Sequence, residues 1–464
     1  MERWQNQEEA YQFAMSRPSV MLAMDMGTGK TKVAIDVSMD RVDVQRVLVV
    51  CPKAVLDVWP KELKKHADSD RYLCYTRQPG RIDDQAKKVK EFIMAKSKPT
   101  QKKYVIINYD SVWRRELGNI VLKANFDMVI LDESHRAKAA GSKVSRFLAQ
   151  LGKRVKYKLC LTGTPMANSP LDVYGQYRFL DPSIYGTNYG AFLQEYAIMG
   201  GPERRFIVGV KNQITLNEKF NSIAYICRMS DIAERLKLPE VLPSITRKVC
   251  LSSRDMKILH TLAKDFIAEC DSGNIIVLNN VLSKVLRMQQ IAAGFCMTTP
   301  GPGEETICEE MNSVKADSLA DLLNDIDMQE KVVVFCQFRH DLNVIRDTTL
   351  QCGRMSFELS GRENSLEHWK IRSGGVLTVQ IQAGAEGIDM TCANHAIYFT
   401  LPHSLALYEQ SKARLYRPGQ HNPVSFIHLI AEGTIDELMY ASLIRKRNLI
   451  DAIQEGSLDY GILK

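Results

Sequence analysis

Two adjacent carboxylates, Asp132 and Glu133, follow a largely apolar run, FDMVIL (126–131), that is typical of a strand. Neighbouring carboxylates repel each other and are costly to bury, so a site that uses them needs a partner such as a metal ion. The alternative interpretation is a strand that runs out into a solvated acidic turn. Short motifs of this kind leave both interpretations open until other parts of the chain are considered.

A second motif, MDMGTGKT (24–31), lies between a strand-like run and a helical pattern. Gly27 and Gly29 let backbone amides turn toward a bound phosphate, and the following helix points its first amides at the same anion. Lys30 can neutralise the β- and γ-phosphates of a nucleotide, and Thr31 can place its hydroxyl on magnesium. The motif therefore predicts nucleotide binding, with a flexible glycine turn as the alternative.

One position departs from the strict phosphate-loop pattern, because Met24 stands where the pattern has glycine or alanine. The order of strand, loop and helix nonetheless fits. In P-loop ATPases an aspartate at a strand end helps to hold magnesium opposite the phosphate loop, and Asp132 suits that role. Glu133 could then orient and deprotonate the attacking water. The two carboxylates tolerate each other because a divalent cation offsets one of them.

Two further loops follow apolar runs. The first, LTGTP (161–165), has hydroxyls and a tight turn that suit a sensor touching the loop around Asp132. The second, QAGAEGIDM (382–390), places Gly387 and Asp389 at a predicted strand-to-helix turn. A GTPase switch would need an N-K-x-D element that reads guanine, and the sequence contains none.

The segment QSKARLYRPGQ (410–420) spaces Gln410, Arg414 and Arg417 as on a helix, which predicts that both arginines share one face. Arginine spreads positive charge onto a phosphoryl group during its transfer. The alternative for this segment is a solvated basic helix face.

The bulk composition limits the class of protein. The chain has 464 residues, enough for two or three domains, and its 45% apolar and 25% charged content is that of a soluble globular protein. A net charge of +7 permits a polyanionic partner without requiring one. The polar N-terminus is no signal peptide, and no apolar run approaches the ~18 residues of a membrane helix. We therefore expect a cytoplasmic protein without membrane contact. The 11 cysteines contain no C-x-x-C pair and are interpreted as structural thiols.

Short β-branched runs alternate with amphipathic stretches, which predicts an α/β fold of parallel sheets with crossover helices. Two such units are expected, at residues 1–178 and 313–464, the second ending in a helix. Residues 179–312 are expected to hold helical insertions and a linker.

Taken in order, the motifs resemble those of the superfamily-two helicases, and within them the Swi/Snf-type DNA translocases. The resemblance runs nearly end to end. It rests on WQNQEEA, MDMGTGKT, VVCPKAVLDVWPKEL, NYDSVWR, LDESH, LTGTPMANSPLDVYGQYRFLDP, VVVFCQFRHDL, AGAEGIDMTCANHAIYF and QSKARLYRPGQ, which are similar to motifs Q, I, Ia, Ib, II, III, IV, V and VI.

The resemblance implies two RecA-like lobes that hold one ATP between them and ratchet along a strand as they close and open. Lys30, Asp132 and Glu133 would come from the first lobe. Arg414 and Arg417 would come from the second, with Arg417 as the arginine finger. Expected cofactors are ATP and Mg²⁺.

The expected contacts follow motif by motif. Gln7 is expected to read adenine, and Thr31 and Asp132 to hold magnesium. The remaining ATP-site residues expected from the motifs are Gly27, Thr28, Gly29, Lys30, Gly387, Asp389 and Gln410.

Some positions depart from the chromatin-type pattern. Ser134 replaces the alanine of the usual DEAH box, Asp389 replaces the asparagine of G-I-N, and RPGQ replaces RIGQ. DESH resembles the annealing-helicase branch, whereas G-I-D is nearer to general superfamily-two helicases. No chromatin-reading or nuclease module is visible, so we expect a compact bacterial or phage-like form that acts in the host cytoplasm.

Such motors hold the sugar–phosphate backbone, so binding without sequence specificity is expected. The partner is duplex or forked DNA, with single-stranded nucleic acid as a further possibility, and a monomer is expected. Candidate contacts by motif position are Lys53, Asn108, Tyr109, Gln337, Arg339 and Gln382. Each could equally be a helix cap or a surface polar residue.

Three functions fit the sequence. The first is a DNA-stimulated ATPase that translocates on duplex or forked DNA. The second is a strand-separating helicase that acts on DNA or RNA. The third, from another class, is a P-loop module that binds ATP as a switch without hydrolysis. Intact phosphate-loop, carboxylate and arginine motifs disfavour the third.

Overall fold

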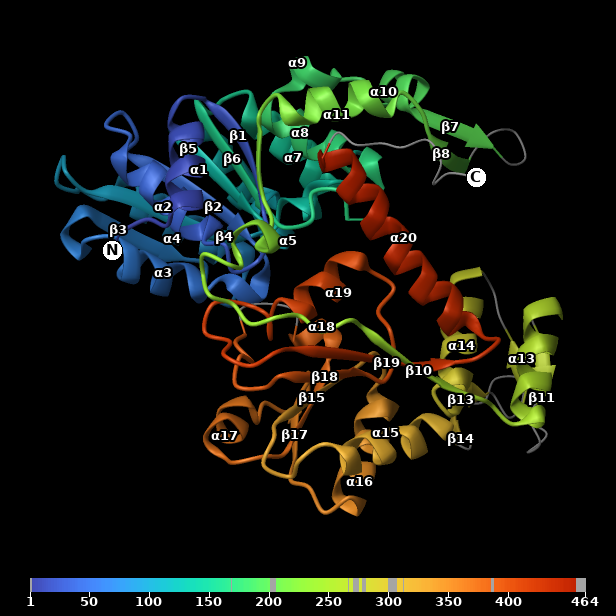
Figure 1. Ribbon diagram of the computed structural model, residues 1–464. Coiled ribbons are helices and arrows are strands. Elements are labelled where there is room, and N and C mark those ends of the chain that lie inside the picture. The colour runs from blue at the N-terminus through green and yellow to red at the C-terminus, as the bar shows by residue number, and fades with distance from the viewer. Residues whose placement is uncertain are drawn as a thin grey trace. The chain divides into compact units, whose positions relative to one another are not determined.

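The structure is a computed structural model, and it describes residues 2–167, 169–200, 206–265, 267–269, 275–277, 281–298, 307–311, 313–384 and 388–455. Up to residue 446, the chain divides into two compact units, Met1–Leu236 and Lys237–Lys446. Each unit contains one multi-stranded sheet with helices around it (Figure 1).

The first unit is built on a parallel sheet of seven strands in the order β3-β4-β2-β5-β6-β1-β9. Its strands are β1 (Ser19–Met24), β2 (Arg46–Cys51), β3 (Tyr72–Thr76), β4 (Lys102–Asn108), β5 (Met128–Asp132), β6 (Tyr157–Thr162) and β9 (Ala224–Cys227). All neighbours pair in parallel. The central strands β1 and β5 are buried at every position, which explains why they read as continuous apolar runs rather than alternating ones.

Helices connect these strands and cover the sheet (Figure 1). They are α1 (Gln5–Met15), α2 (Lys30–Asp40), α3 (Val58–His66), α4 (Ile82–Met94), α5 (Tyr109–Val112), α6 (Arg115–Lys123), α7 (Lys143–Gly152) and α8 (Val173–Leu180), with short 3₁₀ turns η1 (Lys53–Val55), η2 (Ser69–Arg71), η3 (Ser134–Ala137) and η4 (Pro170–Asp172).

The sheet of the first unit extends past residue 178, where the sequence placed the end of the first lobe. Beyond α8 lie α9 (Pro182–Tyr185), α10 (Tyr189–Tyr196), the antiparallel strands β7 (Ala197–Gly200) and β8 (Phe206–Val210), α11 (Gln213–Asn221) and α12 (Met229–Ile232). Between α11 and α12, strand β9 returns to pair with β1. Residues 179–312, expected to hold helical insertions and a linker, thus contain an edge strand of the first sheet. Strand β9 has only four residues, and its partner strand β1 lies about 200 residues earlier in the chain. The local sequence pattern therefore could not predict it.

The second unit contains a parallel sheet of six strands in the order β10-β19-β18-β15-β17-β16. Its strands are β10 (Ile245–Val249), β15 (Val332–Cys336), β16 (Ser356–Leu359), β17 (Val376–Gln380), β18 (His395–Tyr398) and β19 (Ser425–Ala431). Its helices are α13 (Ser253–Asp265), α14 (Val281–Ala292), α15 (Val314–Asp325), α16 (Arg339–Gln351), α17 (Leu366–Ile371), α18 (Ile381–Gly384), α19 (Leu405–Lys412) and the first part, up to residue 446, of α20 (Ile435–Glu455). Two small antiparallel pairs join β11 (Ile267–Glu269) to β12 (Ile275–Val277) and β13 (Phe295–Thr298) to β14 (Ile307–Glu310).

The predicted α/β class with two parallel-sheet lobes is confirmed. No described helix is both long and apolar enough to span a bilayer. The cysteines within the described residues are free, and Cys51, Cys160 and Cys336 are buried in strands, as free cysteine commonly is.

Candidate functional site

The motifs of the first unit meet at one edge of its sheet. Parallel strands end on the same side, and ligands of open α/β sheets bind at that carboxyl edge. Strand β1 leads directly into the loop 25–29, β5 ends at Asp132, and β6 ends at Thr162. The sheet therefore brings together segments that are more than a hundred residues apart in the chain.

The loop after β1 has the backbone of a phosphate cradle. Gly27 and Gly29 adopt φ angles of 83° and 89°, which L side chains rarely adopt. Lys30 opens helix α2 and is only 8% exposed. Thr31 follows it in the first helical turn and is half-buried. The Thr28 hydroxyl donates a 2.7 Å hydrogen bond to the Asp25 carbonyl, so this side chain closes the turn itself.

Gln7 packs directly on this loop. Its Nε2 donates a 3.4 Å hydrogen bond to the Thr28 carbonyl, and its Oε1 accepts one of 3.1 Å from the backbone N–H of Trp4. Asn6 donates to the same Thr28 carbonyl at 3.2 Å. A Cβ on Gly29 would lie 2.2 Å from Gln7 Nε2 and would displace that side chain, and the φ of 89° already disfavours any residue but glycine there. The expected adenine contact of Gln7 stays a prediction, while its contact with the phosphate loop is observed.

The carboxylate pair is buried, which excludes a solvated acidic turn. Asp132 is 5% exposed and Glu133 9% exposed. Lys30 Nζ lies 4.0 Å from Glu133 Oε1, so cradle and carboxylates form one cluster. Asp132 Oδ2 accepts a 2.9 Å hydrogen bond from the indole Nε1 of Trp59, and Oδ1 accepts one of 3.0 Å from the Glu133 N–H.

The electrostatics of Asp132 reflect that burial. The pKa of Asp132 is raised to about 6, first by loss of solvent and then by the neighbouring charge of Glu133, while Lys30 and the Trp59 hydrogen bond oppose the rise. A divalent cation is the partner that would relieve this cost. The donor set fits magnesium, because a buried carboxylate and the Thr31 hydroxyl are hard oxygen ligands.

Glu133 has a strained backbone. Its φ of 50° and ψ of 54° place a non-glycine residue in the left-handed region, a conformation that costs free energy and is concentrated at functional sites. Its Oε2 lies 3.3 Å from His135 Nδ1, and the same nitrogen lies 3.1 Å from Thr162 Oγ1. His135 therefore connects the carboxylate loop to the LTGTP loop, where a sensor contact was expected.

A second bridge joins the same two loops. The Ser134 hydroxyl donates a 2.7 Å hydrogen bond to Gln176 Oε1, and Gln176 Nε2 donates one of 2.7 Å to the Pro165 carbonyl. Gln176 is fully buried on α8. Next to it, a Cβ on Gly175 would lie 2.3 Å from the Ala137 carbonyl, so α8 packs backbone to backbone on η3. Ser134, which departs from the DEAH pattern, thus has a specific partner.

Several of these supporting residues were not found by sequence reasoning. Trp59 lies in the motif Ia segment and Gln176 in the motif III segment, but neither motif specifies a side-chain partner. Asp25 Oδ2 accepts a 2.9 Å hydrogen bond from the Met229 N–H, which ties the phosphate loop to α12 across 204 positions of sequence. The sequence offered one indication of these residues, which is that they lie inside the motif segments.

In the second unit, the arginine motif differs from the prediction in one respect. Helix α19 ends at Lys412, so Arg414 and Arg417 lie in the turns that follow it, and the prediction of a shared helix face is wrong. A proline directly before Gly419 and the C-terminal turn at Ala413 break the pattern. Both guanidinium groups nevertheless approach one carbonyl, that of Ile388, at 3.4 and 3.5 Å.

The other predicted residues of this unit are placed as follows. Gln410 is buried on α19 at 3% exposure. Asp389 is exposed, and its Oδ1 accepts a 3.0 Å hydrogen bond from the Thr391 N–H. Gly387 lies outside the described residues.

The six candidate nucleic-acid contacts fall into two groups. Lys53, Arg339 and Gln382 are exposed and Gln337 is half-buried, so their side chains are accessible. Asn108 and Tyr109 are 3% and 4% exposed, which corrects the expectation that they face a ligand strand.

Tyr109 has a different role in the structure. Its hydroxyl donates a 2.8 Å hydrogen bond to the Asp132 carbonyl and so supports the carboxylate loop from within. The sequence could not show this, because its place at a strand end fits an inward or an outward side chain equally well.

Comparison with known proteins defines the class. The SNF2-related domain matches residues 3–291, and the helicase conserved C-terminal domain matches residues 314–419. The chain belongs to the SNF2-related family and also carries a helicase conserved C-terminal domain. The resemblance to Swi/Snf-type proteins is thereby confirmed.

Individual relatives are distant. Human DNA repair and recombination protein RAD54B is 24% identical over 492 residues, covering 94% of this chain and 52% of that protein. Human DNA annealing helicase and endonuclease ZRANB3 is 25% identical over 470 residues, covering 97% of this chain and 40% of that protein. The chain thus spans about half the length of these curated relatives. It covers 76% of the uncharacterized ATP-dependent helicase YqhH of Bacillus subtilis, at 25% identity over 464 residues and 95% of this chain.

A solved structure is also similar. The Sulfolobus solfataricus SWI2/SNF2 ATPase core in complex with dsDNA aligns with a TM-score of 0.44 and 22% identity, covering 98% of this chain and 94% of that one.

Proposed function

We propose that this chain is a DNA-stimulated ATPase that converts ATP hydrolysis into movement along duplex or forked DNA. The observation that carries the proposal is the buried cluster of Lys30, Asp132 and Glu133 at one sheet edge. A chain that uses ATP only as a switch has no need to hold a strained, buried glutamate beside the phosphate loop.

Each residue of the cluster has a distinct task in this proposal. Lys30 neutralises the terminal phosphates, while Thr31 and Asp132 hold magnesium. The metal, when bound, withdraws charge from the phosphates and orients them. Glu133 accepts a proton from the attacking water, and His135 holds its carboxylate in place.

The arginine motif completes the proposed chemistry. Arg414 and Arg417 approach one backbone carbonyl, which sets their guanidinium groups near each other. We assign Arg417 the stabilisation of negative charge on the phosphoryl group during transfer. We also keep Arg414 and Gln410, which belong to the same motif, as residues of the proposed ATP site.

The names of the relatives support DNA as the partner. RAD54B is named for DNA repair and recombination, and ZRANB3 for DNA annealing. Lys53, Arg339 and Gln382 present exposed polar side chains near strand ends, as contacts to a sugar–phosphate backbone require. Backbone contacts carry no base readout, so sequence-independent binding follows. Strand separation on DNA or RNA is the second candidate function, because it uses the same ATPase cluster.

The deciding experiment is ATP hydrolysis by the purified chain, with Lys30→Ala as the inactive control. Rates are compared without nucleic acid and with single-stranded DNA, duplex DNA, a forked junction and RNA. Strong stimulation by duplex or fork supports translocation on duplex DNA. Stimulation only by single strands or RNA replaces it with strand separation, and no hydrolysis under any condition overturns both.

A further inference from the structure

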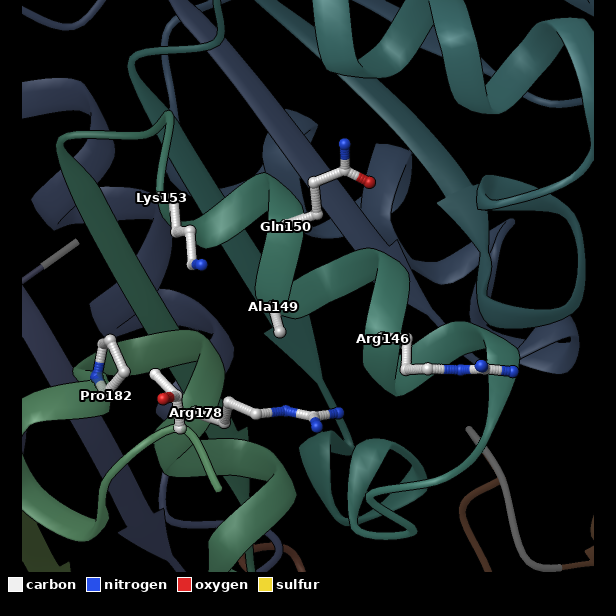
Figure 2. A pocket seen from close by; sticks show the side chains of 7 residues that line it. Arg146, Ala149, Gln150, Lys153, Arg178 and Pro182 are labelled. Atoms are coloured by element: carbon white, nitrogen blue, oxygen red, sulfur yellow. The ribbon is translucent and has the colours of Figure 1, made fainter. Parts of the chain in front are cut away.

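A hollow of about 250 Å³ lies on the first unit, beside α7, the end of α8 and the start of α9 (Figure 2). Its walls include three cationic side chains, Arg146, Lys153 and Arg178, together with the polar side chains of Gln150 and Thr187. No carboxylate lines it. This hollow has no part in the ATPase cluster described above.

The hollow lies away from the carboxyl edge of the sheet. The Ser19 hydroxyl donates a 2.8 Å hydrogen bond to the Leu180 carbonyl, which places the end of α8 beside the first residue of β1. The phosphate loop begins at the other end of that strand, after Met24. Five residue steps of a strand span roughly 17 Å. Arg178 and Pro182, close to Leu180 in the chain, therefore line a second site.

The charges in the hollow are unbalanced, in contrast to two other basic residues of the first unit. Lys138 pairs with Asp172 at 3.2 Å, and Lys156 pairs with Asp43 at 2.5 Å. Within the described part of the chain, Arg146, Lys153 and Arg178 have no carboxylate partner. Three like charges around one concave surface repel each other, and an anion in the hollow would relieve that repulsion.

One of the cations is held in place for binding. Arg178 Nη2 donates hydrogen bonds of 2.8 Å to the Ala140 carbonyl and 3.0 Å to the Ser145 hydroxyl. These two bonds fix the plane of the guanidinium group, whose Cζ also lies 5.6 Å from the ring centroid of Tyr174. In Figure 2 the side chain of Lys153 extends from the end of α7 and that of Arg178 from α8. An oriented guanidinium and an exposed ammonium in one hollow suit a phosphate group.

We propose that this hollow binds a phosphate of the nucleic-acid backbone, as a second contact that adds to those at the sheet edge. The proposal rests on the proposed function, because it takes DNA to be the partner. The volume favours this ligand. Pockets that enclose a whole small molecule measure about 300–1,000 Å³, so a smaller open hollow suits a phosphate with part of its sugar. The free anion shares the same chemistry and is separated from DNA by the test.

The test uses the double variant Arg146→Gln/Lys153→Gln of the full chain. Both side chains are exposed, so the fold is retained, and Arg178 with its structural hydrogen bonds is left intact. The matched control is Lys87→Gln/Lys90→Gln, which removes two exposed charges from α4 of the same unit. Binding of a labelled 30-base-pair duplex is measured by fluorescence anisotropy over a series of salt concentrations.

Each phosphate contact contributes about 0.9 to the slope of log K against log salt concentration. We expect the double variant to lose about 1 from that slope and about tenfold in affinity at low salt, while basal ATP hydrolysis stays unchanged. The control should keep the wild-type slope. Equal slopes for double variant and control would overturn the inference.

A second arm identifies the source of the phosphate. Inorganic pyrophosphate is added to wild type and double variant while thermal stability is followed. Greater stabilisation of wild type than of the double variant, which keeps the phosphate loop, together with an unchanged DNA slope in the variant, would make the ligand a free anion and overturn the backbone assignment. If the wild-type chain binds no nucleic acid at all, the proposed function itself fails. If wild type binds DNA but the double variant keeps the wild-type salt slope, only this inference fails and the proposed function stands.

Discussion

The indole Nε1 of Trp59 donates a 2.9 Å hydrogen bond to Asp132 Oδ2, and both side chains are buried. Trp59 lies on α3, which directly follows the 3₁₀ turn η1 with the exposed Lys53. A segment with an accessible basic residue is therefore joined directly to the carboxylate that we assign to magnesium. Through this bond, a displacement of the motif Ia segment would alter the position of Asp132.

Trp59→Phe should reduce DNA-stimulated turnover. The substitution keeps an aromatic ring in the core but removes a hydrogen bond to a carboxylate, which is worth about 1.5–3 kcal/mol. That corresponds to a loss of roughly 10- to 100-fold in kcat if the bond is needed in the transition state. The control is Trp369→Phe in the second unit, whose indole donates to the Gly375 carbonyl instead. Equal stimulated rates in both variants would remove the positioning role of Trp59.

Glu133→Gln should bind ATP but stop turnover. The amide keeps the shape of the side chain but cannot accept the proton of the attacking water, a role worth about 10²- to 10⁴-fold. Binding is measured with a fluorescent ATP analogue and hydrolysis in single turnover. Unchanged hydrolysis would show that another group acts as the base.

Arg417→Ala should slow hydrolysis more than it weakens ATP binding. An arginine that acts on the transferring phosphoryl group contributes about 10³-fold or more to turnover and little to ground-state binding. Arg346→Ala serves as the control, because Arg346 is paired with Asp347 on α16 and touches no motif. A normal rate in Arg417→Ala, or equal losses in rate and affinity, would contradict the finger role.

The buried His428, which contacts α19, should make the stability of the second unit fall at acidic pH. His428 Nε2 accepts a 2.9 Å hydrogen bond from the Tyr408 hydroxyl on α19, and Nδ1 donates to the Ile245 carbonyl at 3.3 Å. Burial, and to a lesser degree the charge of Lys412, lowers the pKa of His428 to about 4, although the bond to Ile245 opposes this. The unfolded imidazole keeps a pKa near 6.5.

The sign of the effect follows from proton binding. As pH falls from about 6.5 to about 4, the unfolded chain takes up a proton that the folded chain refuses, so stability falls with pH. His428→Gln removes this titration and keeps an acceptor for Tyr408. Its deficit in the free energy of unfolding relative to wild type should therefore shrink by about 2 kcal/mol between pH 7.5 and pH 4.5. The exposed His368→Gln is the control. A constant deficit across this range would show that His428 does not couple folding to pH.

By itself, the sequence determined the class of fold, the order of the motifs and the phosphate cradle. These features depend on local physics. Continuous apolar runs predict buried parallel strands, and glycines at positions 27 and 29 predict the positive φ angles that are observed. It also placed Asp132 and Glu133 at a strand end, where burial then decided between the two interpretations.

Only the tertiary structure decided which side chains support that site. The bonds from Trp59 to Asp132, from Ser134 to Gln176 and from Met229 to Asp25 join residues 73, 42 and 204 positions apart. It also turned Tyr109 inward, ended α19 before the arginines and added β9 to the first sheet. No periodicity or motif spacing records such pairs, because contact between distant segments depends on how helices and strands pack and not on the order of residues within each one.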